Sequence, residues 1–159
     1  MRTSLATSVT ALTLLALAAC GGSSTSTTSD EAVSDVLSKA DFISQGDAIC
    51  AQLTTDTDAV APPADDSDFG RYIGEVLALA SQTGVDFAAL SAPEDGVEVQ
   101  AEMLAALDAS ISSGEGAIDA AAAGDTVTAG DLLTQASTEG SAGDAAAVSY
   151  GFTECGKES

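Results

Sequence analysis

Three interruptions divide the chain between residues 38 and 152 into four stretches in which apolar residues recur at helical spacing. The first two, Ala61-Pro62-Pro63 and Ser91-Ala92-Pro93, contain prolines, which the interior of a helix does not accept. The third, Gly124-Asp125, has the glycine that commonly follows a helix end. No stretch of appreciable length alternates apolar and polar residues as a strand does. We therefore predict an all-α fold, a four-helix bundle-like single domain.

The predicted helices differ in how well their residues suit a helix. The first begins at Ser38 with an acidic residue three positions later, as in a capping box, and the second, over about 68–90, carries the bulkiest apolar stripe. The fourth, over about 129–152, is weaker because Gly140 and Gly143 each cost up to about 1 kcal/mol of helix propensity. These glycines mark either positions where a neighbouring backbone comes close or random drift in a sequence biased toward Ala and Gly, with no structural role. We favour drift.

Aromatic residues must supply most of the bulk of a core that is otherwise rich in alanine. Most of them fall on the predicted inner stripes, so we expect core positions in preference to a binding pocket. A bundle underfilled by Ala and Gly could still enclose an apolar cavity for a small or lipidic ligand. The aromatic residues are Phe42, Phe69, Tyr72, Phe87, Tyr150 and Phe152.

The amino terminus predicts export. Residues 1–19 begin with a basic side chain and continue as a short apolar run, as a signal peptide does. The following Leu17-Ala18-Ala19-Cys20-Gly21 resembles the bacterial lipobox, in which cleavage precedes a cysteine that carries lipid; the alternative is a chance cysteine after an ordinary signal peptide. We therefore expect residues 20–37 to comprise the lipidated Cys20 and a flexible polar tether, and residues 38–159 to form a helical domain. The lipid should anchor this domain at the extracytoplasmic face of the cell membrane.

Two cysteines remain after the predicted cleavage and lipidation. In an exported protein such a pair indicates one disulfide, so we expect Cys50 and Cys155 to be joined, the alternative being two free buried thiols. In the chain-entropy model a bridge across this separation stabilises the fold by about 4–5 kcal/mol. Short connections favour an up-down-up-down topology, which would bring Cys155 toward the start of the first helix, whereas Cys50 lies well along it.

Several short motifs surround these cysteines: Asp41-Phe42-Ile43, Gly46-Asp47-Ala48-Ile49-Cys50, Gly124-Asp125, Tyr150-Gly151-Phe152 and Cys155-Gly156. Together they resemble small secreted or lipid-anchored helical proteins of actinobacteria that have no assigned activity. The resemblance covers most of residues 38–156, with Gly46 in place of the alanine expected there. It implies a disulfide-tied helical domain at the cell surface and does not imply a particular function.

Composition excludes much common chemistry. The chain has no His, so a Ser-His-Asp triad, a Cys-His pair and His-ligated metals are excluded. With 25 acidic against 4 basic residues and a net charge of -21, it would repel phosphate backbones, which excludes nucleic-acid binding. The basic Arg71 can pair with Glu75 or Asp68, which favours a structural role. We expect no catalytic residues and no cofactor.

Clustered carboxylates are the only abundant group of candidate functional side chains in the sequence. Asp65, Asp66 and Asp68 are candidate cation ligands, because Ca²⁺ takes oxygen ligands. The residues counted from Asp66 do not match the EF-hand pattern, because Leu77 occupies the position of the bidentate Glu. A solvated acidic face is therefore favoured over a metal site.

We expect a lipid-anchored, acidic, non-enzymatic cell-surface domain that binds or scaffolds a protein partner in the envelope. The alternative is a small-ligand or cation-binding lipoprotein, with residues 65–68 or the bundle interior as its site.

Overall fold

The computed structural model describes residues 36–157, which contain four long α-helices, two short 3-10 turns and no strand. The elements are α1 (Lys39–Asp58), η1 (Asp66–Asp68), α2 (Phe69–Ala88), η2 (Glu94–Gly96), α3 (Val97–Ala122) and α4 (Thr126–Tyr150). The predicted all-α, four-helix architecture is confirmed. The predicted signal peptide, the lipobox with Cys20 and the tether up to residue 35 lie outside the described residues.

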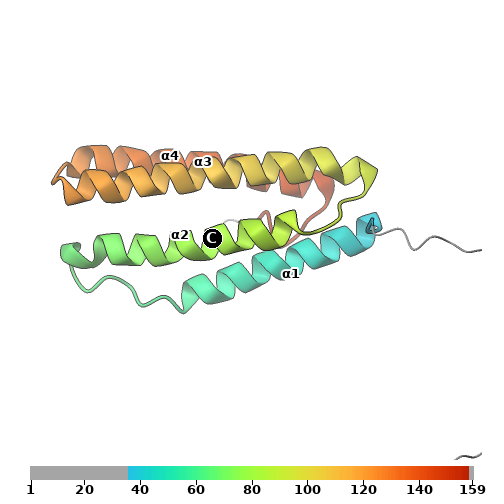
Figure 1. The fold of residues 1–159 in the computed structure, drawn as a ribbon, viewed down its shortest axis with the longest axis horizontal. Helices are drawn as coiled ribbons and strands as arrows, with labels where there is room; N and C mark the ends of the chain where they lie inside the picture. The colour runs from blue at the N-terminus through green and yellow to red at the C-terminus, as the bar shows by residue number, and fades with distance from the viewer. Residues whose placement is uncertain (1–35, 158–159) are drawn as a thin grey trace, which may run out of the picture. The chain divides into compact units, whose positions relative to one another are not determined.

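The helices pack in chain order, α1 on α2, α2 on α3 and α3 on α4, and the last of these contacts is the most extensive. Figure 1 shows α3 and α4 lying side by side, with α1 and α2 as the other pair. Over residues 36–157, no helix combines the length and the apolar character that crossing a bilayer requires.

Local signals account for the helix ends. The Ser38 hydroxyl oxygen accepts a hydrogen bond from the backbone N–H of Asp41 at 3.2 Å, and the hydroxyl donates to the Asp41 carboxylate at 2.6 Å. At the last connection, Asp125 accepts from the backbone N–H of Thr128 and caps α4. Because of this cap, α4 begins at Thr126, three residues before the predicted start.

The core gathers four aromatic rings at one end of the bundle. Phe42 is fully buried, and its ring centroid lies 5.5 Å from that of Phe152, 5.8 Å from that of Phe87 and 5.9 Å from that of Tyr150. These edge-on and tilted contacts are the favoured arrangement of aromatic pairs. The other two aromatics predicted for the core, Phe69 and Tyr72, are half-buried and lie outside this cluster.

Close packing, and not drift, explains one of the two glycines in α4. A Cβ atom on Gly143 would lie 3.0 Å from the Cβ of Ala106 in α3, so a larger side chain would force the two helices apart. A Cβ on Gly140 would meet its nearest neighbour, Ser110 Oγ, at an ordinary 3.8 Å. The prediction that these glycines reflect only a sequence rich in Ala and Gly is therefore wrong for Gly143. It remains compatible with the looser surroundings of Gly140.

The path of the chain after α4 explains how Cys155 reaches Cys50. α4 ends beside the beginning of α1, where the Lys39 ammonium lies 3.9 Å from the centroid of the Tyr150 ring. Gly151 then adopts a φ of 121°, a backbone conformation that favours glycine, and the chain turns back. Residues 152–157, which we call the C-terminal tail, therefore meet the middle of α1, and the antiparallel topology and the disulfide are compatible.

The predicted disulfide is confirmed. Cys50 and Cys155 are bonded with an S–S distance of 2.08 Å and a Cα–Cα distance of 5.1 Å across 105 residues. The bond joins the middle of the first helix to the last described segment of the chain.

Candidate functional site

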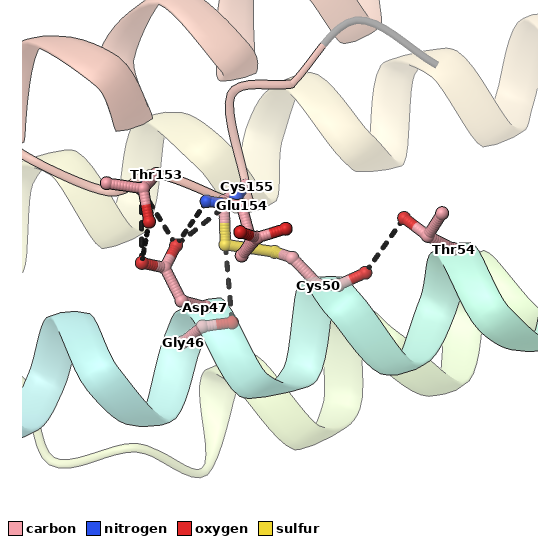
Figure 2. The surroundings of a disulfide bond; sticks show 7 residues. All are labelled: Gly46, Asp47, Cys50, Thr54, Thr153, Glu154 and Cys155. Atoms are coloured by element: carbon pink, nitrogen blue, oxygen red, sulfur yellow. Dashed lines mark hydrogen bonds between the residues drawn. A yellow bond between two sulfur atoms is a disulfide. The ribbon is translucent and has the colours of Figure 1, made fainter.

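A single carboxylate on α1 holds the C-terminal tail by its backbone. Asp47 accepts hydrogen bonds from the backbone N–H groups of Thr153 at 3.0 Å, Glu154 at 2.8 Å and Cys155 at 3.3 Å (Figure 2). The Thr153 hydroxyl donates to the same carboxylate at 2.8 Å. Three consecutive N–H groups thus converge on one anion, which resembles the way the N-terminus of a helix binds a negative charge.

The electrostatics of Asp47 follow from these contacts. Partial burial raises the pKa of the Asp47 carboxyl, but the hydrogen bonds from the Glu154 N–H, from the Thr153 hydroxyl and N–H and from the Cys155 N–H outweigh it. The pKa therefore lies below its ordinary value, and the carboxylate form is the one that binds the tail.

The disulfide lies beside this cluster. Asp47 and Cys50 are three residues apart in α1, so their side chains leave the same face of the helix. Cys155 Sγ also lies 3.3 Å from the carbonyl oxygen of Gly46 (Figure 2). A Cβ on Gly46 would lie 2.5 Å from a ring carbon of Phe152, so the absence of a side chain there lets the tail approach the helix closely.

A pocket of about 200 Å³ opens next to the disulfide, and all four helices and the tail contribute to its lining. Gly140 and Gly143 contribute to its lining from α4. The apolar part of the lining comprises Leu53, Phe87, Met103, Leu104 and Leu107.

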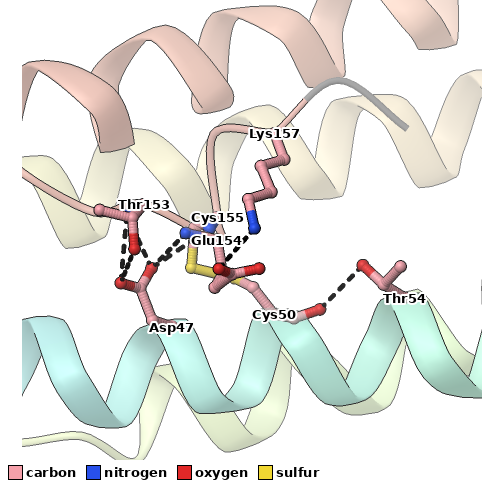
Figure 3. Close-up of polar contacts among 7 residues, drawn as sticks. All are labelled: Asp47, Cys50, Thr54, Thr153, Glu154, Cys155 and Lys157. Atoms are coloured by element: carbon pink, nitrogen blue, oxygen red, sulfur yellow. Dashed lines mark hydrogen bonds and ion pairs between the residues drawn. A yellow bond between two sulfur atoms is a disulfide. The ribbon is translucent and has the colours of Figure 1, made fainter.

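The pocket lining also includes charged residues. Asp144 of α4 lines the pocket, together with Glu154 and Lys157 of the tail. The Lys157 ammonium forms an ion pair with the Glu154 carboxylate (Figure 3). The charged residues of the lining therefore include this ion pair and Asp144, which has a further interaction within the protein.

Two of the acidic residues predicted as cation ligands, Asp65 and Asp68, accept hydrogen bonds in the turn before α2. Asp65 accepts hydrogen bonds from the backbone N–H of Ser67 at 2.9 Å and from its hydroxyl at 2.6 Å, and these bonds lower the pKa of the Asp65 carboxyl. Asp68 accepts from the backbone N–H of Ala64 at 3.2 Å. In the part of the chain that the structure describes, no three acidic or cysteine side chains are grouped to hold a metal ion. The site at Asp65, Asp66 and Asp68 stays a prediction.

Arg71 takes the structural role predicted for it. Its guanidinium donates to Glu75 at 3.2 Å and lies 3.6 Å from the Asp68 carboxylate. The hydrogen bond to Glu75 and the attraction of both carboxylates raise the pKa of Arg71. The group therefore links the turn to the first turns of α2.

Comparisons with family models, with curated proteins and with solved structures find no match for this chain. The resemblance to actinobacterial surface proteins stays a prediction. The pocket, the tail and the predicted anchor are therefore the features that bear on function.

Sequence reasoning did not find the role of Asp47 or the charged residues of the pocket lining. A signal for Asp47 was present, because an acidic residue three positions before a bridged cysteine shares its helix face and can reach the same partner segment. No such signal exists for Asp144 and Lys157, which line one pocket because α4 and the tail meet there in space.

Proposed function

We propose that this protein is a lipid-anchored, non-enzymatic binding domain at the extracytoplasmic face of the cell membrane, and that it takes a small ligand into the pocket beside the Cys50–Cys155 disulfide. The observation that carries the proposal is the mostly apolar pocket with a few charged residues in its lining, which is the usual makeup of a small-molecule site. The envelope location rests on the predicted signal peptide and on Cys20.

The pocket volume limits the ligand. A volume of about 200 Å³ is below the usual range for drug-sized molecules, which begins at about 300 Å³. An apolar cavity of about 150 Å³ is large enough for a benzene-sized molecule. The pocket therefore suits one ring or a short alkyl group, with any polar part of the ligand left at the mouth.

The tail supports binding without a large rearrangement. Cys155 is covalently fixed to α1, and Asp47 holds the backbone on its amino-terminal side. Because one wall of the pocket is fixed in this way, a ligand does not have to order it, and less binding free energy is lost.

The test uses the protein purified after export from an expressing bacterium, in lipid nanodiscs where the anchor is present, with empty nanodiscs as the blank. Fluorine NMR would follow three ring probes: para-fluorophenethylammonium, para-fluorophenethyl alcohol and para-fluorophenylacetate. Binding of at least one probe supports the proposal if it is lost in Gly140→Leu, which adds a side chain at a residue of the pocket lining.

The matched control is Gly130→Leu in the same helix, where an added Cβ meets nothing within 4 Å and which is not part of the pocket lining. Both variants replace a helical glycine, so both gain helix propensity. Failure of all three probes to bind, or equal loss of binding in both variants, would contradict the small-ligand proposal.

A protein partner in the envelope is the second candidate, and a groove between α2 and α3 favours it. Its lining includes Val85, Leu107 and Ile111, and Val85 is 63% exposed. A photo-crosslinking residue at position 85 on intact cells should capture one protein that the same residue at position 127 does not. Val127 is the matched control because it is exposed on α4 and is not part of this groove.

A further inference from the structure

We propose that the surface between α1 and α2 docks a basic segment of a partner protein, in which an apolar side chain lies between Lys or Arg residues. This surface, which we call the α1–α2 groove, has a volume of about 260 Å³. Its lining includes Ile49, Leu53 and Leu79, with Asp56 on α1 and Asp86 on α2. The proposal does not depend on the small-ligand function, because Asp56 and Asp86 are not part of the lining of the pocket beside the disulfide.

The apolar part of the α1–α2 groove comes from both helices. Ile49 and Leu53 of α1 and Leu79 of α2 are each partly buried and contribute to the lining. The groove lies along the least extensive of the helix contacts that follow chain order, since α1 packs on α2 less than α2 packs on α3 or α3 on α4. A partner side chain that covers this surface gains about 25 cal/mol for each Å² of apolar surface removed from water.

The two carboxylates of the groove have neutral hydrogen-bond donors. The side-chain amide of Gln52 donates to Asp56 at 2.8 Å, and that of Gln82 donates to Asp86 at 2.9 Å. Each donor lies one turn before its acceptor on the same helix. Because an amide is neutral, these bonds orient the carboxylates without cancelling their charge.

The basic side chains of the described chain are engaged elsewhere. Residues 36–157 contain three of them, and each forms ion pairs with carboxylates other than those of Asp56 and Asp86. No basic residue contributes to the lining of the groove. The α1–α2 groove therefore combines an apolar surface with two carboxylates that no cation of the described residues compensates. The ion pairs are Lys39–Asp95, Arg71–Asp68, Arg71–Glu75 and Lys157–Glu154.

A second hollow extends the groove and favours a chain segment over a small molecule. It has a volume of about 530 Å³, shares Asp56 and Leu79 with the groove, and continues to Val60, just past the end of α1. Its other carboxylate, Glu75, is paired with Arg71. A surface that continues along two helices in this way suits several consecutive residues of a partner.

Charge decides which occupant fits the groove. A second copy of this chain would bring its own formal net charge of -21 and would be repelled. Residues 20–35, which precede the described segment after the predicted cleavage, contain three acidic residues and no basic one. Anionic lipid headgroups are repelled for the same reason. A basic segment of another protein complements both the apolar and the acidic parts of the groove.

The test measures binding of the peptide acetyl-Lys-Ala-trifluoroleucine-Ala-Lys-amide by fluorine NMR. The exported protein is used in nanodiscs of uncharged lipid, with empty nanodiscs as the blank. A second peptide, in which both lysine side chains are acetylated, keeps the length and loses the charge. The Lys peptide is expected to bind at least about fivefold more tightly, and the ratio should shrink as salt rises from about 0.05 to 0.5 M. No binding of the Lys peptide, or equal binding of the two peptides, would overturn the proposal.

A double variant tests whether the groove is the site. Asp56→Asn combined with Asp86→Asn keeps an oxygen that can accept from each glutamine and should weaken Lys-peptide binding at least about threefold. The matched control is Asp119→Asn combined with Asp131→Asn, which removes the same charge from exposed positions on α3 and α4 outside the groove. Equal weakening in both double variants would show that binding follows net charge alone and would overturn the proposal.

Two further variants keep the test decisive if the groove variant fails to fold, as judged by circular dichroism. Ala48→Lys adds a cation at an exposed residue of the groove lining, so it should weaken Lys-peptide binding, and an unchanged affinity would contradict the proposal. Gly140→Leu, which alters the pocket beside the disulfide, should leave Lys-peptide binding unchanged. Loss of Lys-peptide binding in Gly140→Leu would place the peptide in that pocket and overturn the groove as its site. Failure of the three ring probes, in contrast, would overturn only the small-ligand function.

Discussion

Asp47 and Cys50 lie one turn apart on the same face of α1 and hold the same six-residue tail by different means. Asp47 binds the backbone of Thr153, Glu154 and Cys155 through hydrogen bonds, and Cys50 binds Cys155 covalently. The first contact depends on the charge of a carboxylate and the second on the oxidation state of two sulfurs. Because one wall of the pocket is built from this tail, both contacts control the proposed binding site.

Replacing Asp47 should destabilise the protein. Asp47→Ala removes a charged acceptor from several hydrogen bonds, and we expect a loss of about 1.5–3 kcal/mol in the free energy of unfolding. Urea unfolding followed by circular dichroism measures it. Asp58→Ala, at the exposed end of the same helix, should change stability by no more than about 0.5 kcal/mol. Equal effects of the two substitutions would refute the role given to Asp47.

Removing the disulfide should lower the free energy of unfolding by more than Asp47→Ala does. Cys50→Ser combined with Cys155→Ser should lower the free energy of unfolding by about 4 kcal/mol, because the unfolded chain regains the freedom that a 105-residue separation had restricted. A large drop in the urea midpoint is the expected result. A midpoint within error of the wild type would contradict it.

The losses from Asp47→Ala and from removal of the disulfide should not add. Both changes release the tail, so after one of them the other has less structure left to break. A double-mutant cycle in urea should give a combined loss smaller than the sum of the separate losses. Strict additivity would show that the two contacts act on separate parts of the fold.

The contribution of Asp47 should disappear in acid. Its pKa is lowered in the folded protein, so the unfolded state binds more protons between the two pKa values and stability falls as pH drops through this window. The stabilisation is present above about pH 4 and is lost below it. The difference in unfolding free energy between wild type and Asp47→Asn, measured at pH 6 and at successively lower pH, should shrink toward zero. The difference is used because the many other carboxylates titrate in both proteins. A gap that persists at the lowest pH would count against this account.

Adding one methyl group at Gly46 should disrupt the core. In Gly46→Ala the new Cβ would meet Phe152 at 2.5 Å and Phe87 at 2.8 Å, and we expect a loss of about 1–3 kcal/mol. Gly74→Ala in α2 is the control, because its Cβ meets nothing within 4 Å and the change should stabilise by up to about 1 kcal/mol. Thermal unfolding should move in opposite directions for the two variants. A Gly46→Ala variant as stable as the wild type would show that the rings move aside easily.

The predicted anchor is tested by Cys20→Ser. If Cys20 carries lipid, the variant should lose labelling by a fatty acid probe and should leave the membrane fraction after processing. Retention of a processed variant on membranes would mean that another contact holds the protein there.

The sequence by itself determined the number of helices, most of their ends and the cysteine pair. These features depend on neighbouring residues: prolines stop helices, Ser38 caps α1, and apolar spacing marks the inner faces. The start of α4 was missed by three residues, because the cap at Asp125 also resembles the end signal of the preceding helix. Local sequence signals therefore determine which segments form helices, and predictions from them place the helix ends with errors of a few residues.

Only the tertiary structure decided how these elements create a site. The turn at Gly151 brings the tail to α1, so that Asp47 and Cys50 meet partners more than 100 residues away. The pocket forms where four helices and the tail leave space beside Gly140. No local pattern encodes such a meeting, because its energy depends on side chains that become neighbours only when the whole chain has folded.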